Sequence, residues 1–436
     1  MYSVGLYTLG CKVSQYETEA IAEAFERKGC RILPFGDACD IYVINTCTVT
    51  QESDRKSRQI IRRAIGRNPD GVICVVGCYS QRAPESVASI DGVDICLGTN
   101  DKLSVVELAI GLAEEKKEDR EQLVSAPPLD NVLFEPMCIT RGQRTRVYVK
   151  IEDGCESKCT YCAISSARGP VRSKPMEQVI SEVEGLAANG TKEIVLTGIE
   201  TGSYGRDLGL DNGLGTLIRT LWERGSCERI RLGSLAPELV GEKFAESIKG
   251  VKTLAPHFHI SMQSGSDSVL RNMKRRYNTR MAYENIERLR DTVEGAQFTT
   301  DMMVGFPNES EEDFLATVDF VKKARFLDVH VFAYSKREGT PAAEYDGQIP
   351  EDVKRRRSAY LIDVKNRQRD EILAETVKAG KPLRAILESY RNGRYTAHSD
   401  SFIELSVEAD RGMNGEYVWV EPLASENGVI SCQIIK

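Results

Sequence analysis

The chain has 436 residues, a length that allows about two to four domains, each with a hydrophobic core of its own. Its composition, 41% hydrophobic and 28% charged, is that of ordinary globular proteins and excludes a low-complexity chain. The net charge of −7 excludes a general electrostatic attraction to RNA, and no apolar segment approaches the ~18 residues that cross a bilayer. The amino terminus has no basic segment followed by a long apolar one, so we expect a cytoplasmic protein without membrane contacts.

Short β-rich segments alternate with helical segments in residues 1–113. The strand candidates are VGLYTLG, IYVINTC, GVICVVGC and the weaker DICLG, and helical patterns such as YETEAIAEAFERKG stand between them. This alternation predicts a parallel sheet with helices on both faces, here a flavodoxin-like α/β domain. Residues 114–139, which are charged and contain Pro, are expected to form a linker.

A second series of strands and helices occupies residues 140–370. Its strand candidates are RTRVYVKI, EIVLTG, RIRLGS, HFHISMQ, FTTDMMVG and DVHVFAYS, with helical patterns between them. These β-α units predict a partial (β/α)6 barrel, which has fewer units than the closed eight-unit form. A basic helical stretch, EDVKRRRSAYLIDVKNRQRDEILAE, ends the series. The short alternating segments of residues 375–436 then predict a small all-β barrel.

Three cysteines of the first series stand at the carboxyl ends of strand candidates. They are Cys11 in TLGC, Cys47 in INTC and Cys78 in VVGC. Loops at that edge of a parallel sheet converge, so side chains far apart in the chain can meet there. Three thiolates suit an iron–sulfur or zinc centre, which predicts a metal site. The alternative is that three buried cysteines share this edge by accident.

The segment GCESKCTYCAISSARG holds Cys155, Cys159 and Cys162 in the spacing C-x3-C-x2-C. It follows the first strand candidate of the barrel, which places it on a loop at the barrel mouth, where active sites are built. A zinc site would need a fourth ligand, and no second C-x2-C or H-x3-H pair follows. A redox C-x-x-C pair would not need Cys155. Three thiolates without a fourth suit a [4Fe–4S] cluster whose open iron binds a small molecule.

The remaining cysteines show no pattern. A cytoplasmic chain keeps its thiols reduced, so a disulfide framework is not expected. We expect these residues to be small buried hydrophobic residues: Cys30, Cys39, Cys74, Cys96, Cys138, Cys227 and Cys432.

A C-x3-C-x2-C motif on the first loop of a partial barrel resembles the radical S-adenosylmethionine enzymes. The order of the three domains is similar to that of the methylthiotransferases across essentially the whole chain. The stretches that carry this resemblance are GCESKCTYC, ARGPVRS, QSGSDSVLRNMKRRY, VGFPNESEEDF and YSKREGTPA. The start, TLGCKVSQYETEAI, is most similar to the branch that acts on N6-threonylcarbamoyladenosine in tRNA. Sister branches act on isopentenyladenosine in tRNA or on an aspartate of a ribosomal protein.

The resemblance implies two [4Fe–4S] clusters and S-adenosylmethionine as cofactors. Cys155, Cys159 and Cys162 would be catalytic and hold the cluster that generates a radical. Cys11, Cys47 and Cys78 would hold an auxiliary cluster that carries the sulfur. The product would carry a methylthio group on C2 of the modified adenosine at position 37. The anticodon stem-loop of tRNA and an electron donor of the flavodoxin or ferredoxin type would be the partners. A non-enzymatic metal-binding protein and a radical enzyme with an unrelated substrate are the alternatives.

Contacts to S-adenosylmethionine are expected from Gly198, Gln263 and Gly305, which end successive strand candidates of the barrel. Turn formation is the alternative explanation of both glycines. The sequence also departs from the family after the barrel cysteines. Residues 163–165 read Ala-Ile-Ser, where many members have Ile-Ile-Pro.

RNA contacts are expected from the carboxy-terminal module, a TRAM-like unit. Arg391 and Arg394 would contact phosphates, and Tyr395 would stack on a base. The basic clusters at 271–280 and 354–357 flank the barrel. A solvated helix face is the usual meaning of such clusters, and that alternative stays open.

Overall fold

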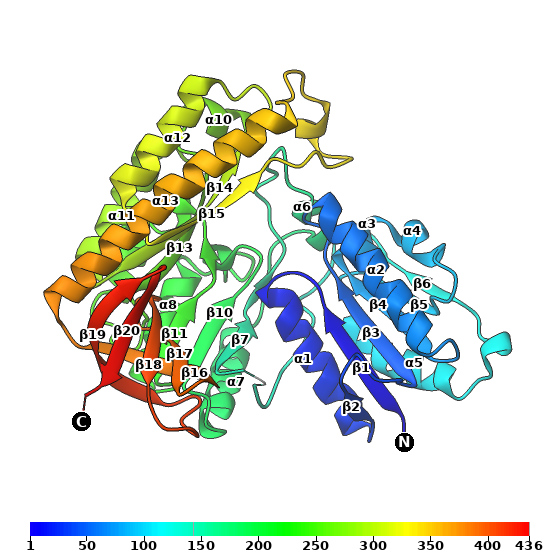
Figure 1. Ribbon diagram of the computed structural model, residues 1–436. Helices are drawn as coiled ribbons and strands as arrows, with labels where there is room; N and C mark the ends of the chain where they lie inside the picture. The colour runs from blue at the N-terminus through cyan, green and yellow to red at the C-terminus, as the bar shows by residue number, and fades with distance from the viewer. Residues whose placement is uncertain (143, 436) are drawn as a thin grey trace.

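The computed structural model describes residues 1–142 and 144–435, which form three units (Figure 1). The first unit is built on a parallel sheet with the strand order β2-β1-β3-β4-β5-β6. Its strands are β1 (Ser3–Thr8), β2 (Arg31–Leu33), β3 (Ile41–Thr46), β4 (Val72–Gly77), β5 (Ile95–Leu97) and β6 (Leu123–Ser125). Every residue of β3 and β4 is buried, which explains why these segments are largely apolar rather than alternating.

Helices cover both faces of this sheet, as the alternation of strands and helices predicts. Helices α1 (Lys12–Arg27) and α5 (Val105–Ala113) pack on one face, and α2 (Gln51–Arg67) and α4 (Pro84–Ala88) pack on the other. The short helix α3 (Cys78–Arg82) follows β4 directly. Strand β6 pairs with β5 and lies within the stretch expected to be a linker, so the sheet extends further along the chain than its sequence indicates.

The second unit is the partial barrel, and all of its expected strand segments form strands. Two adjoining parallel sheets have the orders β11-β10-β7 and β12-β13-β14-β15. The strands are β7 (Arg146–Lys150), β10 (Glu193–Thr197), β11 (Arg229–Leu232), β12 (Ser234–Leu235), β13 (His257–Gln263), β14 (Gln297–Val304) and β15 (Asp328–Ala333). Only Gly233 separates β11 from β12, so these two short strands occupy one place in the barrel.

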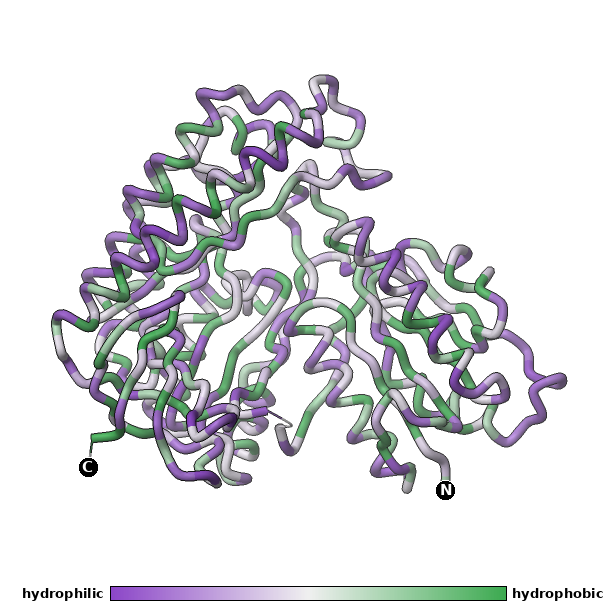
Figure 2. The backbone as a smooth tube through the Cα atoms, in the orientation of Figure 1, coloured by the Kyte–Doolittle hydropathy of each residue, from purple (hydrophilic) through white to green (hydrophobic). Residues whose placement is uncertain are grey.

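Helices surround the outside of the barrel. They are α7 (Met176–Ala188), α8 (Gly213–Glu223), α9 (Glu242–Ile248), α10 (Asp267–Asn272), α11 (Thr279–Thr292) and α12 (Glu311–Ala324). Their apolar faces and the strands share one continuous hydrophobic core. In Figure 2 the strands carry long hydrophobic stretches, whereas the outer helices alternate between hydrophobic and hydrophilic residues. This pattern is the expected one for amphipathic helices that cover a buried sheet.

The long helix α13 (Glu351–Ala379) crosses the outside of the barrel and leads to the third unit. This unit is a closed barrel with the strand order β16-β17-β18-β20-β19, as expected for residues 375–436. Its strands are β16 (Leu383–Arg391), β17 (Arg394–Ser399), β18 (Glu404–Glu408), β19 (Tyr417–Glu426) and β20 (Val429–Ile434). The closed barrel leaves no free sheet edge.

The three units contact one another around the (β/α)6 barrel. Helix α1 of the first unit packs against β7. The third unit contacts the amino-terminal ends of the barrel strands, where Arg146 pairs with Glu388 (2.9 Å) and Tyr417 donates to Glu193 (2.9 Å). Within the described chain, no helix combines the length and the apolar character needed to span a bilayer.

The cysteines outside the two predicted metal sites are buried, with one exception. Cys138 is exposed, so the expectation of a buried hydrophobic role is wrong for this residue. It lies between the first unit and β7, in a segment without helix or strand, where its neighbours Met137 and Ile139 are buried and Cys138 faces outward.

Candidate active site between two cysteine triads

The N-terminal triad (Cys11, Cys47 and Cys78) lies at the carboxyl edge of the first sheet. Cys11 precedes α1, Cys47 directly follows β3, and Cys78 begins α3. Gly10 lets the first two of these loops approach each other. Its φ is +119°, and a Cβ atom at this position would lie 3.1 Å from Cys47 Cβ. Cys11 is exposed and Cys78 is buried, so the triad has one open side and one side enclosed by protein.

The barrel triad (Cys155, Cys159 and Cys162) lies on the loop after β7. Two short antiparallel strands, β8 (Glu152–Asp153) and β9 (Arg172–Ser173), close the base of this loop. Gly154 begins the loop with a φ of +89°, and a Cβ atom there would lie 1.9 Å from the carbonyl oxygen of Pro170. Only glycine fits this position, because both the conformation and the close approach exclude a side chain.

Hydrogen-bond donors surround the sulfur atoms of the barrel triad. The amide of Ser157 donates to Cys155 Sγ (3.4 Å), and the amide of Ile164 donates to Cys162 Sγ (3.3 Å). Arg275 donates from Nη1 to Cys159 Sγ (3.1 Å). Such donors stabilise negative charge on sulfur, which is the state that a metal ligand requires.

Arg168 connects the barrel loop to the N-terminal triad. It ends helix α6 (Ile164–Arg168), which follows the barrel triad, and its Nε donates to Cys78 Sγ (3.2 Å). Its guanidinium is fully buried and also donates from Nη1 to Glu17 (2.6 Å) on α1. One side chain therefore fixes the barrel loop against the N-terminal triad and against the first helix of the same unit.

The spread of the sulfur atoms bears on the kind of metal centre. In residues 1–142 and 144–435, no three cysteines have sulfur atoms that all lie within 4.8 Å of one another. Two sulfur atoms bound to one zinc ion at ~2.3 Å can be no more than about 4.6 Å apart. As the structure places them, the three sulfur atoms of each triad are therefore too far apart to bind one zinc ion together.

Comparisons with known proteins identify the family. Residues 149–321 match the radical SAM superfamily, and residues 3–98 match an uncharacterized protein family, UPF0004. The chain is 38% identical over 429 residues to the threonylcarbamoyladenosine tRNA methylthiotransferase MtaB of Bacillus subtilis, covering 97% of this chain and 94% of that protein. It is 36% identical to the protein of the same name from Thermotoga maritima, covering 99% and 97%.

The chain belongs to the radical SAM methylthiotransferase family. A more distant member is the tRNA-2-methylthio-N(6)-dimethylallyladenosine synthase of Clostridioides difficile, which is 33% identical and covers 84% of this chain and 77% of that protein. Among solved structures, the radical S-adenosylmethionine methyltransferase TsrM from Kitasatospora setae aligns with a TM-score of 0.57 at 16% identity, covering 78% of this chain and 77% of that one. That likeness concerns the fold.

Membership in this family implies S-adenosylmethionine and a [4Fe–4S] cluster, and the barrel triad lies within the matched residues 149–321. Its thiols would lose protons when iron binds. Burial, aided by the Glu200 carboxylate, raises the pKa of Cys155 to about 12. Burial likewise raises the pKa of Cys162 and, in the N-terminal triad, raises that of Cys78 to about 11. Metal binding at either triad would therefore compete with protons.

The three residues expected to contact S-adenosylmethionine lie at the carboxyl ends of β10, β13 and β14. A Cβ atom on Gly198 would lie 2.3 Å from Glu152 Oε2, and one on Gly305 would lie 2.3 Å from Lys354 Cγ. Packing within the protein thus accounts for both glycines. Gln263 is half-buried and has a φ of +65°. A contact of these residues with the cofactor stays a prediction.

The structure separates the residues expected to contact RNA. Arg391 is exposed at the turn between β16 and β17, and the side chain of Arg394 is 38% exposed beside Glu408. Tyr395 is 1% exposed, and its hydroxyl accepts hydrogen bonds from the amides of Gly412 and Met413. The expected stacking of Tyr395 on a base is therefore wrong, because this ring belongs to the core of the small barrel.

Sequence reasoning missed several residues that shape the site. Arg168 lies in the stretch ARGPVRS, but nothing in the sequence indicates that it contacts Cys78. Arg275 lies in the basic cluster 271–280, where it contacts Cys159, while Arg276 donates to the carbonyl oxygen of Glu156 (2.8 Å). Two arginines of this basic segment thus hold the cysteine loop in place.

Proposed function

We propose that this protein transfers a methylthio group to C2 of N6-threonylcarbamoyladenosine at position 37 of tRNA. The observation that carries the proposal is the contact of Arg168, on the helix after the barrel triad, with Cys78 of the N-terminal triad, because sulfur insertion needs a sulfur source beside the place where the C–H bond is broken. The choice of base rests on the names of the relatives from Bacillus subtilis and Thermotoga maritima.

Two [4Fe–4S] clusters are part of this proposal, one on each triad. When bound, the clusters and S-adenosylmethionine would supply the one-electron chemistry and the sulfur that a C–H bond without acidity requires. The protein itself would hold the sulfur ligands in place. Arg275 neutralises charge at Cys159, and Arg168 does so at Cys78. A protein of the flavodoxin or ferredoxin type would deliver the electrons, in the cytoplasm.

The anticodon stem-loop of tRNA is the proposed partner. The closed β-barrel of residues 383–434 supports this role, because small barrels of this kind bind single strands and loops. Arg391 and Arg394 stand on the surface of this barrel and would contact phosphates. Tyr395 takes no part.

Nucleoside mass spectrometry of tRNA from a deletion strain tests the proposed function. Methylthiolated threonylcarbamoyladenosine should disappear from the strain and return with the wild-type gene. The Cys159→Ala gene should fail to restore it, because two thiolates do not hold the barrel cluster. A specific loss of methylthiolated isopentenyladenosine instead would favour the activity named for the relative from Clostridioides difficile and contradict the proposal.

A further inference from the structure

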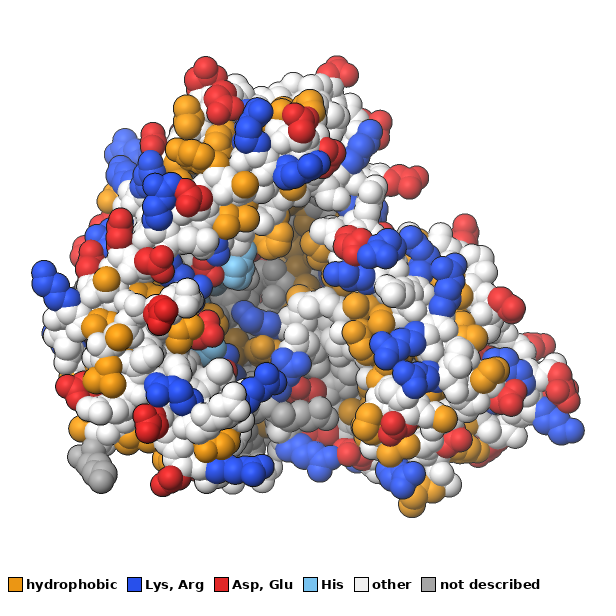
Figure 3. Space-filling view, in the orientation of Figure 1, with side chains coloured by type: hydrophobic (Ala, Val, Ile, Leu, Met, Phe, Trp, Pro, Cys, Tyr) orange, Lys and Arg blue, Asp and Glu red, His pale blue; other side chains and the backbone are white. Residues whose placement is uncertain are grey.

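A cavity of about 360 Å³ lies where the three units of the molecule meet. Inward-facing residues of the barrel strands line most of it. Lys12 at the start of α1 contributes from the first unit, and Phe402 and Glu404 contribute from the third. Figure 3 shows a hollow between the two larger units whose wall carries histidine and Lys or Arg side chains. Because Lys12 directly follows Cys11, the cavity adjoins the N-terminal triad.

Most charged groups on the wall already have partners that offset them. Arg146 pairs with Glu388 (2.9 Å), and Arg231 pairs with Glu193 (2.5 Å). The carboxylate of Asp328 pairs with Lys365 (2.7 Å), which does not line the cavity. In each of these three pairs the carboxylate is already engaged, so none of them is free to neutralise another cation of the wall.

Lys12 differs from these residues. Within the described parts of the chain, its ammonium has no hydrogen bond and no ion pair. It lines the cavity together with Arg146 and Arg231, and its side chain is half-buried. The cavity thus holds a positive charge that lacks a counterion.

Two buried polar atoms of the wall also lack hydrogen-bond partners among residues 1–142 and 144–435. They are Nη1 of Arg231 and Nδ1 of His257. These residues are 4% and 5% exposed. Arg231 offers a donor, and His257 is held in place by Phe402, whose ring stacks on it at 4.5 Å between centroids. Buried polar atoms without partners are rare in proteins, and a ligand that supplies their partners is one explanation of them.

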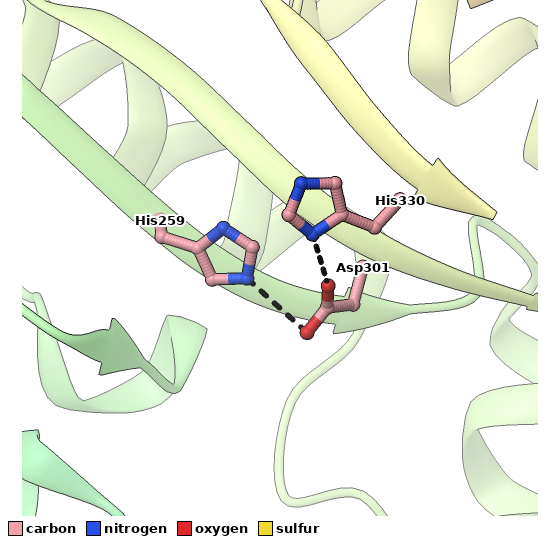
Figure 4. Close-up of side chains that lie close together, drawn as sticks. All are labelled: His259, Asp301 and His330. Carbon is pink, nitrogen blue, oxygen red and sulfur yellow. Dashed lines mark hydrogen bonds and ion pairs between the residues drawn. The ribbon is translucent and has the colours of Figure 1, made fainter. Parts of the chain in front are cut away.

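A divalent metal is the first alternative occupant, because His259, Asp301 and His330 lie together in this region (Figure 4). However, both oxygens of Asp301 are already engaged: Oδ2 with His259 Nε2 and Oδ1 with His330 Nδ1, each at 3.2 Å. The hydrogen bond to Asp301 raises the pKa of His330. With Lys12 nearby as well, the region repels a cation and attracts an anion.

We propose that this cavity binds the carboxylate of the amino-acid group on the substrate adenosine, with Lys12 as its counterion. The inference rests on the proposed function, because a threonylcarbamoyl group carries a carboxylate and a hydroxyl, whereas a dimethylallyl group carries neither. A carboxylate would pair with Lys12 and offer an acceptor to Arg231. An uncharged apolar group would leave the Lys12 ammonium without a counterion and Nη1 of Arg231 without an acceptor, so the cavity selects the charged base.

Binding of anticodon stem-loops to the anaerobically reconstituted holoenzyme tests this inference. The loops should differ only at position 37, which carries threonylcarbamoyladenosine, the same base with its carboxylate converted to an amide, or unmodified adenosine. The wild-type protein should bind the carboxylate loop at least about tenfold more tightly than the amide loop. Lys12→Met should remove this preference, and Lys12→Arg should retain most of it.

The matched control is Lys322→Met, which removes an exposed lysine from the outer face of α12 and should keep the preference. Iron content and the electron paramagnetic resonance spectrum of Lys12→Met verify that the cluster beside it is intact. An equal loss of affinity for all three loops would mean that Lys12 binds an RNA phosphate and would overturn the inference. An unchanged preference for the carboxylate loop in Lys12→Met would also overturn the inference. The same holds if the wild-type protein binds one zinc ion per chain and His330→Ala loses it.

The same loops separate this inference from the proposed function. If the wild-type holoenzyme methylthiolates an isopentenyladenosine loop and not the threonylcarbamoyladenosine loop, the proposed function fails. If it methylthiolates the threonylcarbamoyladenosine loop but does not distinguish the carboxylate from the amide, only the inference about the cavity fails.

Discussion

At the scale of single residues, arginines rather than further cysteines shape the environment of the two triads. Arg168 and Arg275 each donate to one sulfur atom, at 3.2 and 3.1 Å. Both are held by other contacts: Arg275 also donates to the carbonyl oxygen of Ser261 (3.2 Å), and Arg168 to Glu17. Since hydrogen bonds to ligand sulfurs raise the reduction potential of an iron–sulfur cluster, these arginines would tune the two centres separately.

Replacement of Arg275 tests this tuning. Arg275→Met should make the midpoint potential of the barrel cluster more negative by an amount on the order of 60 mV, which corresponds to a tenfold change for one electron. An anaerobic redox titration followed by electron paramagnetic resonance measures the shift. Arg276→Met is the control, because Arg276 donates to the carbonyl oxygen of Glu156 rather than to a sulfur atom. Equal potentials in the Arg275→Met variant and the wild type would show that the contact does not tune the cluster.

At the scale of elements, a buried group of charges holds helix α1 against the barrel. Glu17 on α1 contacts Lys150 of β7 (2.8 Å), Lys102 (3.2 Å) and Arg168 (2.6 Å), and all of these side chains are buried. Burial alone would raise the pKa of Glu17, but these three cations hold it well below its usual range. The contact between the two units thus depends on a charged carboxylate.

Glu17→Gln should therefore lower the free energy of unfolding by about 3–5 kcal/mol, because it leaves buried cations without their partner. Since the pKa of Glu17 is depressed in the folded protein, its stabilisation is complete above about pH 4.5, the usual pKa of a free glutamate, and is lost as the pH falls through the folded-state value. Urea unfolding at pH 8, 7, 6 and 5 should show a constant difference between wild type and variant. The control is Glu26→Gln, whose surface pair with Arg141 should contribute less than about 1 kcal/mol.

The sequence predicts long elements well and short or edge elements poorly. The barrel strands and α13 follow from periodicity, because each buries a continuous face. Strands β2 and β6 have three residues each and lie at the two sheet edges, where little burial constrains their sequence. Tyr395 illustrates a different limit. In RYTAHS the alternation is weak, so the sequence does not tell which face of β17 points inward, and the structure buries Tyr395 and Ala397.

Local sequence patterns predict the two cysteine triads of the candidate site, but not the contacts between the units. The spacing of the barrel triad is a local signal, and the strand-end positions of the N-terminal triad follow from the topology of a parallel sheet. The link through Arg168 joins residues 90 positions apart, and Lys12 meets the barrel strands only because α1 packs on β7. Contacts of this kind depend on how the units are docked, which no local pattern encodes.

At the scale of the whole molecule, the two triads belong to different units that could act separately. Cys47 follows β3 of the first unit, whereas the barrel triad lies on a loop built from residues 152–173. Arg168 and Glu17 hold the units together through contacts that do not involve the Cys47 thiol. Loss of Cys47 should therefore empty the N-terminal triad of its proposed cluster and leave the barrel triad intact.

Cys47→Ala should then separate radical formation from product formation. The variant should still convert S-adenosylmethionine to 5′-deoxyadenosine in the presence of a reductant, because that step needs only the barrel cluster. It should make no methylthiolated adenosine, because the sulfur source is missing. An anaerobic assay with threonylcarbamoylated tRNA quantifies both products at once, and Cys138→Ala, which removes an exposed cysteine outside both triads, should match the wild type in both. If Cys47→Ala forms methylthiolated product at the wild-type rate, the N-terminal cysteines are structural and the sulfur comes from another source.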